Sequence, residues 1–302
     1  MSTEIRGVLP VIQTPYDEQE RIDFETLARE IDWLYEQGVD GIVLAMVSEV
    51  LRLTDAERAE LTEFACERSS DRGPVIASVG AESSFAAAER ARHAESVGAA
   101  AVMAIPPLSI PLDEPELRRY FERILEAVPI PVIVQDASGY VGRPMSIEFQ
   151  AALRRDFGPR VLFKPEAQPI GPRLSELLEA TGGQAAVFEG SGGAELVDSH
   201  RRGIVGTMPS ADTIDALIVL WNALERGDAA VAERIDQGLQ PLLALQKSLD
   251  GYLAVEKFLL VKRGLFRNEI IRGPVGFRLT DEMKAEVEAR FAELERIVAE
   301  CR

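Results

Sequence analysis

Short apolar, β-branched runs alternate with amphipathic stretches along the first two thirds of the chain. The runs are typical of buried strands, and the amphipathic stretches repeat their apolar positions at helical spacing. Leu27, Ile31 and Leu34, for example, mark the apolar face of a helix predicted over 24–37. The predicted strands are 7–14, 41–46, 74–80, 101–106, 131–136, 161–164, 185–189 and 203–207. The further helices predicted between them are 54–69, 84–97, 145–155, 171–180 and 193–201.

The order of these elements predicts the fold class. Consecutive strand–helix units favour a parallel sheet covered by helices, and a count of eight favours closure into a barrel. After about Asp212 the strand pattern ends. Helical patterns continue over 213–226, 228–249, 252–265 and 279–300. We therefore predict an α/β chain with a (β/α)8 TIM barrel over residues 1–226 and a C-terminal helical extension of the same domain over residues 227–302.

Charge and composition exclude several classes of protein. The formal net charge is −17, which argues against nucleic-acid and anionic-membrane partners because both need a basic face. No apolar run approaches the ~20 residues that span a bilayer, and the N-terminus lacks the pattern of a signal peptide. Cys66 and Cys301 are the only cysteines, and His93 and His200 are the only histidines. We therefore expect a cytoplasmic protein with no disulfide framework and no metal site.

One lysine lies at the end of a predicted buried strand. Lys164 is the first lysine of the chain, and the next is Lys247. A lysine is rarely placed at the end of an apolar run unless the protein uses it, and a desolvated amine of lowered pKa attacks ketones to form a Schiff base. The alternative is a strand-end lysine that reaches solvent, in a chain where 28 of the 33 basic residues are arginine. This stretch alone leaves both interpretations open.

Polar side chains follow the other predicted strands, where functional groups gather in such a barrel. They provide hydroxyl, amide and carboxyl groups without a cluster of metal ligands: Thr14, Ser48, Glu49, Ser78, Gln135, Asp136, Glu166, Glu189 and Thr207. This set suits carbonyl chemistry through an imine. Gly190, Gly192 and Gly193 allow backbone N–H groups to approach a substrate carboxylate, although a barrel turn explains these glycines equally well.

Landmarks along nearly the whole chain resemble the dihydrodipicolinate synthase and N-acetylneuraminate lyase superfamily of class I aldolases. In chain order, they are 11–16, 48–54, 75–77, 163–164, 188–190 and 203–207. The resemblance implies the TIM barrel and a Schiff-base role for Lys164. It also implies a small-molecule 2-keto acid as partner, no cofactor beyond the covalent imine, and a homo-oligomer, either tetramer or dimer.

Several positions depart from the synthases of that superfamily. Residues 45–49 read Ala-Met-Val-Ser-Glu, where the resemblance implies two threonines that hold a pyruvate carboxylate and relay protons. The tyrosine of the fifth strand aligns with Gln135, which cannot titrate, and the tyrosine after the fourth strand falls at Leu108. The arginine that receives the second substrate's carboxylate aligns with Tyr140. These departures argue against a synthase that makes dihydrodipicolinate.

The remaining pattern is more similar to the 2-keto-3-deoxy sugar-acid dehydratases, in particular the L-2-keto-3-deoxyarabonate dehydratases. The similar segments are Ser-Glu at 48–49, Val-Gln-Asp-Ala at 134–137, Phe-Lys-Pro-Glu at 163–166 and the glycines at 203–206. This resemblance implies a dehydration in which Lys164 attacks the C2 ketone. A base then removes a C3 proton, and the C4 hydroxyl leaves as water.

Glu166 is the first candidate for this base. It lies two residues after Lys164, so if the strand geometry continues past Pro165 both side chains project to the same side of the backbone. Burial raises a carboxyl pKa and a protonated imine lowers it, so the net shift stays open at this point. Glu189 is the second candidate. Each carboxylate also has a structural alternative. Glu166 would pair with a loop arginine, and Glu189 would support residues that contact the substrate. Asp136, a third carboxylate at a strand end, would belong to a turn or support other residues.

Other residues are expected to bind the substrate. Gln135 and Ser48 would contact substrate oxygens, while backbone N–H groups around Val47 and Ser48 would hold the C1 carboxylate. Ser48 is alternatively a turn residue, and Tyr140 either reaches the distal end of the substrate or caps its loop. The full set of expected substrate-binding residues is Val47, Ser48, Tyr140, Glu189, Gly190 and Val205.

Two other functions remain open. A pyruvate-dependent aldolase or condensing lyase uses the same imine, but its products differ because dehydration releases no pyruvate. A non-catalytic barrel that binds a keto acid is an alternative from another class, and its affinity would survive Lys164→Ala. The sequence decides neither the substrate's stereochemistry nor its chain length.

Overall fold

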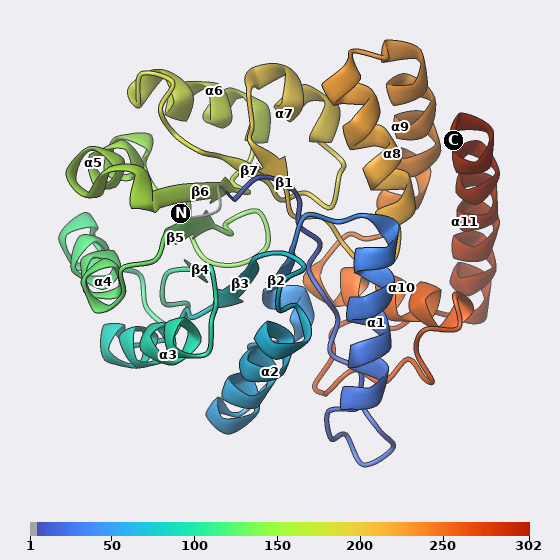
Figure 1. Ribbon diagram of the computed structural model, residues 1–302, viewed down its shortest axis with the longest axis horizontal. Coiled ribbons are helices and arrows are strands. Elements are labelled where there is room, and N and C mark those ends of the chain that lie inside the picture. Colours follow the sequence, from blue (N-terminus) through green and yellow to red (C-terminus); the bar gives the residue numbers. More distant parts are fainter. Residues whose placement is uncertain (1–4) are drawn as a thin grey trace.

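The computed structural model describes residues 5–302, and its strands form a ring enclosed by helices (Figure 1). The strands are β1 (Gly7–Val8), β2 (Ile42–Leu44), β3 (Val75–Ser78), β4 (Ala101–Ala104), β5 (Val132–Asp136), β6 (Val161–Pro165), β7 (Phe188–Glu189) and β8 (Gly206–Thr207). The barrel helices are α1 (Phe24–Gln37), α2 (Asp55–Arg68), α3 (Ser84–Ser96), α4 (Glu114–Ala127), α5 (Ile147–Phe157), α6 (Ile170–Ala180), α7 (Leu196–Arg202) and α8 (Ile214–Arg226). The helices that follow are α9 (Ala229–Leu243), α10 (Leu249–Lys262) and α11 (Asp281–Cys301).

The strands are all parallel and follow the order of the chain. One sheet has the order β2-β3-β4-β5-β6, and the other has the order β1-β8-β7. Single parallel bridges join the two sheets, Val11 with Val43 at one seam and Phe163 with Val187 at the other. The predicted (β/α)8 barrel with a C-terminal helical extension is therefore confirmed.

Alternate residues of each strand pack on opposite sides of the sheet. Ile76, Met103 and Ile133 belong to a buried cluster that contains no residue of the barrel helices, so they fill the barrel interior. Val102 and Val132 instead pack in the large cluster that includes the helices. Both faces of β4 and β5 are thus apolar, which explains their nearly continuous apolar runs in the sequence.

Some predicted boundaries were wrong. β1, β7 and β8 have two residues each, because the rest of the predicted strands 7–14, 185–189 and 203–207 is irregular, with single bridges at Val11 and Val187. The helix predicted over 228–249 ends at Leu243. A new helix, α10, begins at Leu249, since the Ser248 hydroxyl caps it by accepting from the Gly251 N–H at 3.1 Å.

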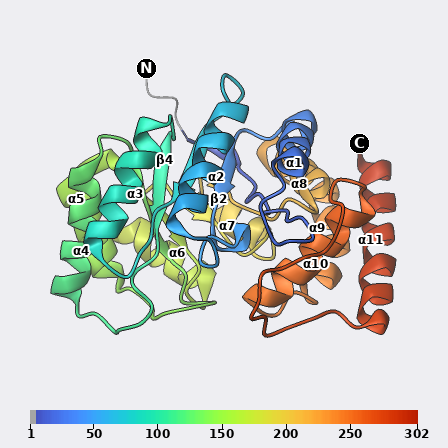
Figure 2. The ribbon, with the colours of Figure 1, turned by 90° about the horizontal axis from the view of Figure 1, so that it is seen from below.

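The C-terminal helices lie together at one side of the barrel (Figure 2). α9 packs against α8 and α11, whereas α10 packs against the short 3₁₀ turn η1 (Met46–Ser48) that follows β2. The extension therefore brings α10 next to the carboxyl ends of the strands. No helix among residues 5–302 is long and apolar enough to cross a membrane.

Candidate active site

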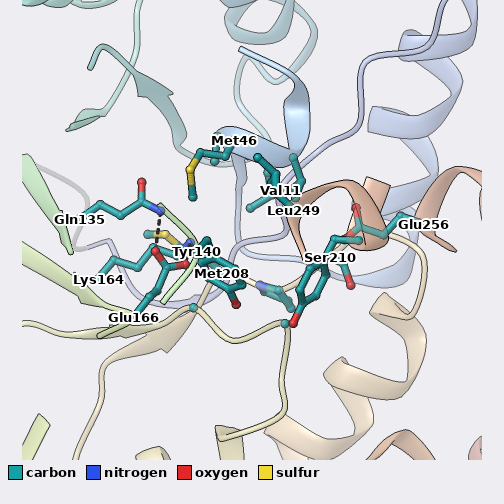
Figure 3. A pocket seen from close by; sticks show the side chains of 16 residues that line it. Val11, Met46, Gln135, Tyr140, Lys164, Glu166, Met208, Ser210, Leu249 and Glu256 are labelled. Carbon is teal, nitrogen blue, oxygen red and sulfur yellow. Dashed lines mark hydrogen bonds and ion pairs between the residues drawn. The ribbon is translucent and has the colours of Figure 1, made fainter. Parts of the chain in front are cut away.

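A pocket lies where the strands end at their carboxyl side, with α10 forming one wall (Figure 3). The pocket contains about 450 Å³ of empty space. Six of the residues expected in the site line it: Val47, Gln135, Tyr140, Lys164, Glu166 and Gly190. Ser48, Glu189 and Val205 do not line it.

Lys164, Glu166 and Gln135 form the polar center of the pocket (Figure 3). The Lys164 Nζ donates to Glu166 Oε1 at 2.9 Å, and the Gln135 Nε2 donates to Glu166 Oε2 at 2.7 Å. β5 and β6 set this geometry, because Gln135 and Lys164 are paired in the parallel register. All three side chains are buried. Lys164 therefore does not reach solvent, and its partner is the carboxylate two residues along the strand.

The surroundings of Glu166 set its protonation. Burial raises the pKa of the Glu166 carboxyl, and the neighboring Lys164 and Gln135 offset that rise only in part. A carboxyl of raised pKa that also accepts from an amine is suited to exchange protons with it. The structure thus shows that the net shift of the Glu166 pKa is upward, which the sequence left open.

Ser48 holds the loop after β2. Its hydroxyl donates to the Ile12 carbonyl at 2.5 Å and accepts from the Ala45 N–H at 3.1 Å. The Thr14 hydroxyl donates to the Ser48 carbonyl at 2.6 Å. The Ser48 side chain thus takes the turn role given as its alternative, while Val47 lines the pocket.

Glu189 and Asp136 have structural hydrogen bonds. Glu189 accepts from the backbone N–H and hydroxyl of Ser191 and from the hydroxyl of Thr207. Asp136 accepts from the Ser138 hydroxyl at 2.6 Å and from the Met145 N–H at 2.9 Å. Both carboxylates therefore hold the loops that follow their strands. Of the two candidates for a base, Glu166 alone lines the pocket.

Val205 belongs to the approach to β8. Its N–H donates to the Val187 carbonyl at 2.9 Å, across the seam with the approach to β7. Its side chain packs against the cluster that fills the barrel interior. Val205 therefore lies below the pocket.

Two tyrosines close one side of the pocket. The rings of Tyr140 and Tyr252 meet edge to face, with their centroids 5.8 Å apart. Burial raises the pKa of Tyr252 to about 12 and also raises the pKa of Tyr140. Both phenols therefore stay protonated in the neutral range. Tyr140 comes from the loop after β5, and Tyr252 comes from α10.

The sequence did not identify the pocket residues contributed by α10 and by the segment after β8. These are Met208, Pro209, Ser210, Leu249, Tyr252 and Glu256. One signal was available: Glu256 and Lys257 are adjacent charged residues in the apolar run 253–261. Both are buried, and the Lys257 ammonium pairs with Glu49 and donates to the Thr14 carbonyl at 2.8 Å. The ion pair between Lys257 and Glu49 anchors α10 to the loop after β2.

A buried lysine–carboxyl pair at the strand ends of a TIM barrel is suited to Schiff-base chemistry. The chain belongs to the dihydrodipicolinate synthetase family, which matches residues 4–294. The family resemblance of the sequence is therefore confirmed, as is the lyase class.

Three relatives illustrate the range of this family. L-2-keto-3-deoxyarabonate dehydratase of Azospirillum brasilense is 29% identical over 97% of this chain and 96% of its own length. 4-hydroxy-tetrahydrodipicolinate synthase of Bartonella quintana is 28% identical over 90% of this chain and 92% of its own length. The solved structure of dihydrodipicolinate synthase from Rhodopseudomonas palustris has a TM-score of 0.86 at 25% identity, covering 96% of this chain and 97% of that chain.

Proposed function

We propose that this protein is a hydro-lyase that dehydrates a 2-keto-3-deoxy sugar acid through an imine on Lys164. The observation that carries the proposal is the buried contact of 2.9 Å between Lys164 Nζ and Glu166 Oε1. The amine is held at the end of β6 beside a carboxyl of raised pKa. A nucleophile and a proton acceptor thus lie together in one pocket.

Lys164 and Glu166 account for each proton in the reaction. Glu166 takes a proton from the Lys164 ammonium, and the neutral amine attacks the C2 ketone. The former carbonyl oxygen takes this proton back from Glu166 and a second proton from the attached nitrogen, and it leaves as water, which gives a protonated imine and an ionized Glu166. Glu166 then removes a C3 proton and returns it to the C4 hydroxyl as the C4–O bond breaks. Water hydrolyses the resulting unsaturated imine and releases Lys164, so no cofactor is required.

Gln135 supports this order of steps. Its amide has no titratable proton, but it donates to Glu166 Oε2 at 2.7 Å. It therefore orients the carboxyl while leaving Oε1 to Lys164. The relative named as an L-2-keto-3-deoxyarabonate dehydratase supports the same substrate class.

Borohydride trapping tests the proposal. The protein is incubated with pyruvate or with a panel of 2-keto-3-deoxy sugar acids, and any imine is reduced with borohydride. Mass spectrometry then measures the intact mass of the protein. We expect a covalent adduct in the wild type that is absent from Lys164→Ala. Lys247→Ala is the matched control, because Lys247 is exposed, and it keeps the adduct. No adduct with any keto acid would overturn the imine mechanism.

Product analysis separates dehydration from its main rival. Relatives named 4-hydroxy-tetrahydrodipicolinate synthase, one of them 28% identical, favor a pyruvate-dependent aldolase or condensing lyase as the second candidate. Dehydration yields a deoxygenated keto acid without pyruvate, whereas cleavage of the same substrate releases pyruvate. Reversible binding without turnover, undiminished in Lys164→Ala, would instead indicate a non-catalytic keto-acid-binding barrel.

We also propose that the chain forms a homo-oligomer. Phe85, Leu108 and Ile110 are large apolar side chains that are exposed in the single chain, and a second copy would cover such residues. Sedimentation velocity tests this proposal, with a dimer or tetramer as the expected species. A monomer at micromolar concentration would overturn it.

A further inference from the structure

Glu256 lies in the pocket on the opposite side from Lys164, Glu166 and Gln135 (Figure 3). It projects from α10, and its side chain is fully buried. Its Oε2 accepts from the Gln13 amide. Its Oε1 has no hydrogen-bond partner among residues 5–302. A buried polar atom without a partner is unfavorable, which points to a ligand that supplies the missing hydrogen bond.

No cation neutralizes Glu256 within the described residues. The adjacent Lys257 is directed elsewhere, since it pairs with Glu49 and donates to the carbonyls of Thr14 and Ile270. The charged groups that face Glu256 are themselves acids, Glu30 and Asp212. Burial and these two carboxyls raise the pKa of Glu256 well above its ordinary value, and the Gln13 hydrogen bond and the charge of Lys257 offset this rise only in part. This direction favors the protonated form of the Glu256 carboxyl.

A protonated carboxyl offers one O–H donor and one acceptor oxygen, which matches the single donor and the lone pairs of an alcohol. A second carboxylate is a poor match, because it would add charge to a buried group of three acids. The chemistry at this end of the pocket thus favors a neutral hydroxyl over an acidic group.

We propose that Glu256 determines specificity by binding a hydroxyl group on the distal carbons of the keto acid that reacts at Lys164. This inference rests on the proposed function and names the substrate class at the far end of the same pocket. A site built to hydrogen-bond a substrate hydroxyl discriminates strongly against the analogue that lacks it, because its own polar group is then left unpaired.

Binding of two keto acids tests the inference. 2-Oxopentanoate and 5-hydroxy-2-oxopentanoate differ only in the distal hydroxyl, and neither carries the C4 hydroxyl that dehydration requires. Calorimetry measures their affinities in Lys164→Ala, where no imine forms, and borohydride trapping measures half-saturation with Lys164 present. Because both acids are compared across variants, any difference in their open-chain fractions cancels.

We expect the hydroxylated acid to bind about 10-fold tighter, the order typical of a hydrogen bond between a substrate and a buried group. Glu256→Leu abolishes this preference. Glu256→Gln keeps it, because a carboxamide also offers a donor and an acceptor, and this conservative variant guards against loss of folding. Glu286→Leu, at an exposed residue of α11, is the matched control and keeps the preference.

A ratio of the two affinities that is the same with Glu256 and in Glu256→Leu would overturn the inference. Absence of trapped adduct combined with a calorimetric preference would overturn the imine mechanism alone and support the role of Glu256. The two failures are thus distinguishable.

Discussion

The backbone of Gly190 lies directly against the side chain of Lys164. A Cβ atom at residue 190 would be 2.6 Å from Lys164 Cε and 2.8 Å from Glu166 Oε1. Such distances do not occur between nonbonded atoms, so the position admits no side chain without movement of the lysine or the carboxyl. The close approach of the backbone at residue 190 to Lys164 and Glu166 therefore explains why a glycine is needed here. This explanation is more specific than a barrel turn.

Gly190→Ala is expected to lower kcat/KM by about 100-fold. The added methyl group displaces Lys164 and Glu166 from each other, and a shift of about 1 Å in reacting groups has an effect of this size. Steady-state kinetics and the rate of borohydride trapping measure the loss. The control is Gly276→Ala, where a Cβ atom would lie 3.4 Å from its nearest neighbor, Asp250 Oδ2. Unchanged kinetics in Gly190→Ala would contradict the geometry.

Glu166→Gln is expected to lower kcat by ~10²–10⁴-fold, the contribution typical of a general base. The amide can still accept from Lys164 but cannot take a C3 proton. Because Glu166 also accepts the Lys164 proton in the proposed mechanism, imine is expected to form more slowly in this variant and then to accumulate, since the C3 proton is no longer removed. Loss of kcat without accumulation of imine would assign Glu166 to imine formation instead.

The pH dependence of the wild type should reflect the raised pKa of Glu166. A base works in its ionized form, so kcat/KM falls as pH decreases through that pKa. Because burial raises this pKa, the fall of kcat/KM on the acid side of the profile, the acid limb, occurs at a pH above the ordinary pKa range of a glutamate. A pH–rate profile measures the limb, which Glu166→Gln should remove. An acid limb in the ordinary glutamate range would argue against this base.

Glu30 is expected to make the fold less stable as pH rises. Burial raises its pKa from 4.5 to about 8. The folded chain therefore keeps a proton that the unfolded chain releases, and the free energy of unfolding decreases between about pH 4.5 and 8 by at most ~1.4 kcal/mol per pH unit. Glu30→Gln should make this decrease shallower in urea unfolding at several pH values. Glu36→Gln, an exposed control on α1, should leave it unchanged.

Lys257→Met is expected to destabilize the fold by about 3 kcal/mol, because it leaves the buried Glu49 carboxylate with only Arg52 at 3.7 Å and the Arg272 N–H at 3.1 Å as partners. Lys257 and Glu49 are both fully buried. The control is Lys262→Met, whose ion pair with Glu288 is about half exposed and is typically worth ~0–1 kcal/mol. Urea unfolding measures both variants. Equal stabilities of the two variants would show that α10 does not depend on the buried pair.

The sequence by itself determined the barrel, the lysine and its carboxyl partner. Strand and helix periodicity is local, and parallel strands joined by helices have few possible arrangements. The period of two along a strand, continued one residue past the end of β6, also places Lys164 and Glu166 on one side, and the two side chains are in contact. These inferences needed no knowledge of distant contacts.

Only the tertiary structure decided which polar residues face the pocket. Ser48 and Glu189 stand at strand ends like Gln135, yet their side chains hold loops. Tyr252 and Glu256 lie far along the chain in α10, and they reach the pocket because α10 packs against the turn after β2. The sequence could not assign these roles, because burial and hydrogen-bond partners depend on which distant segments meet, and these set both orientation and pKa.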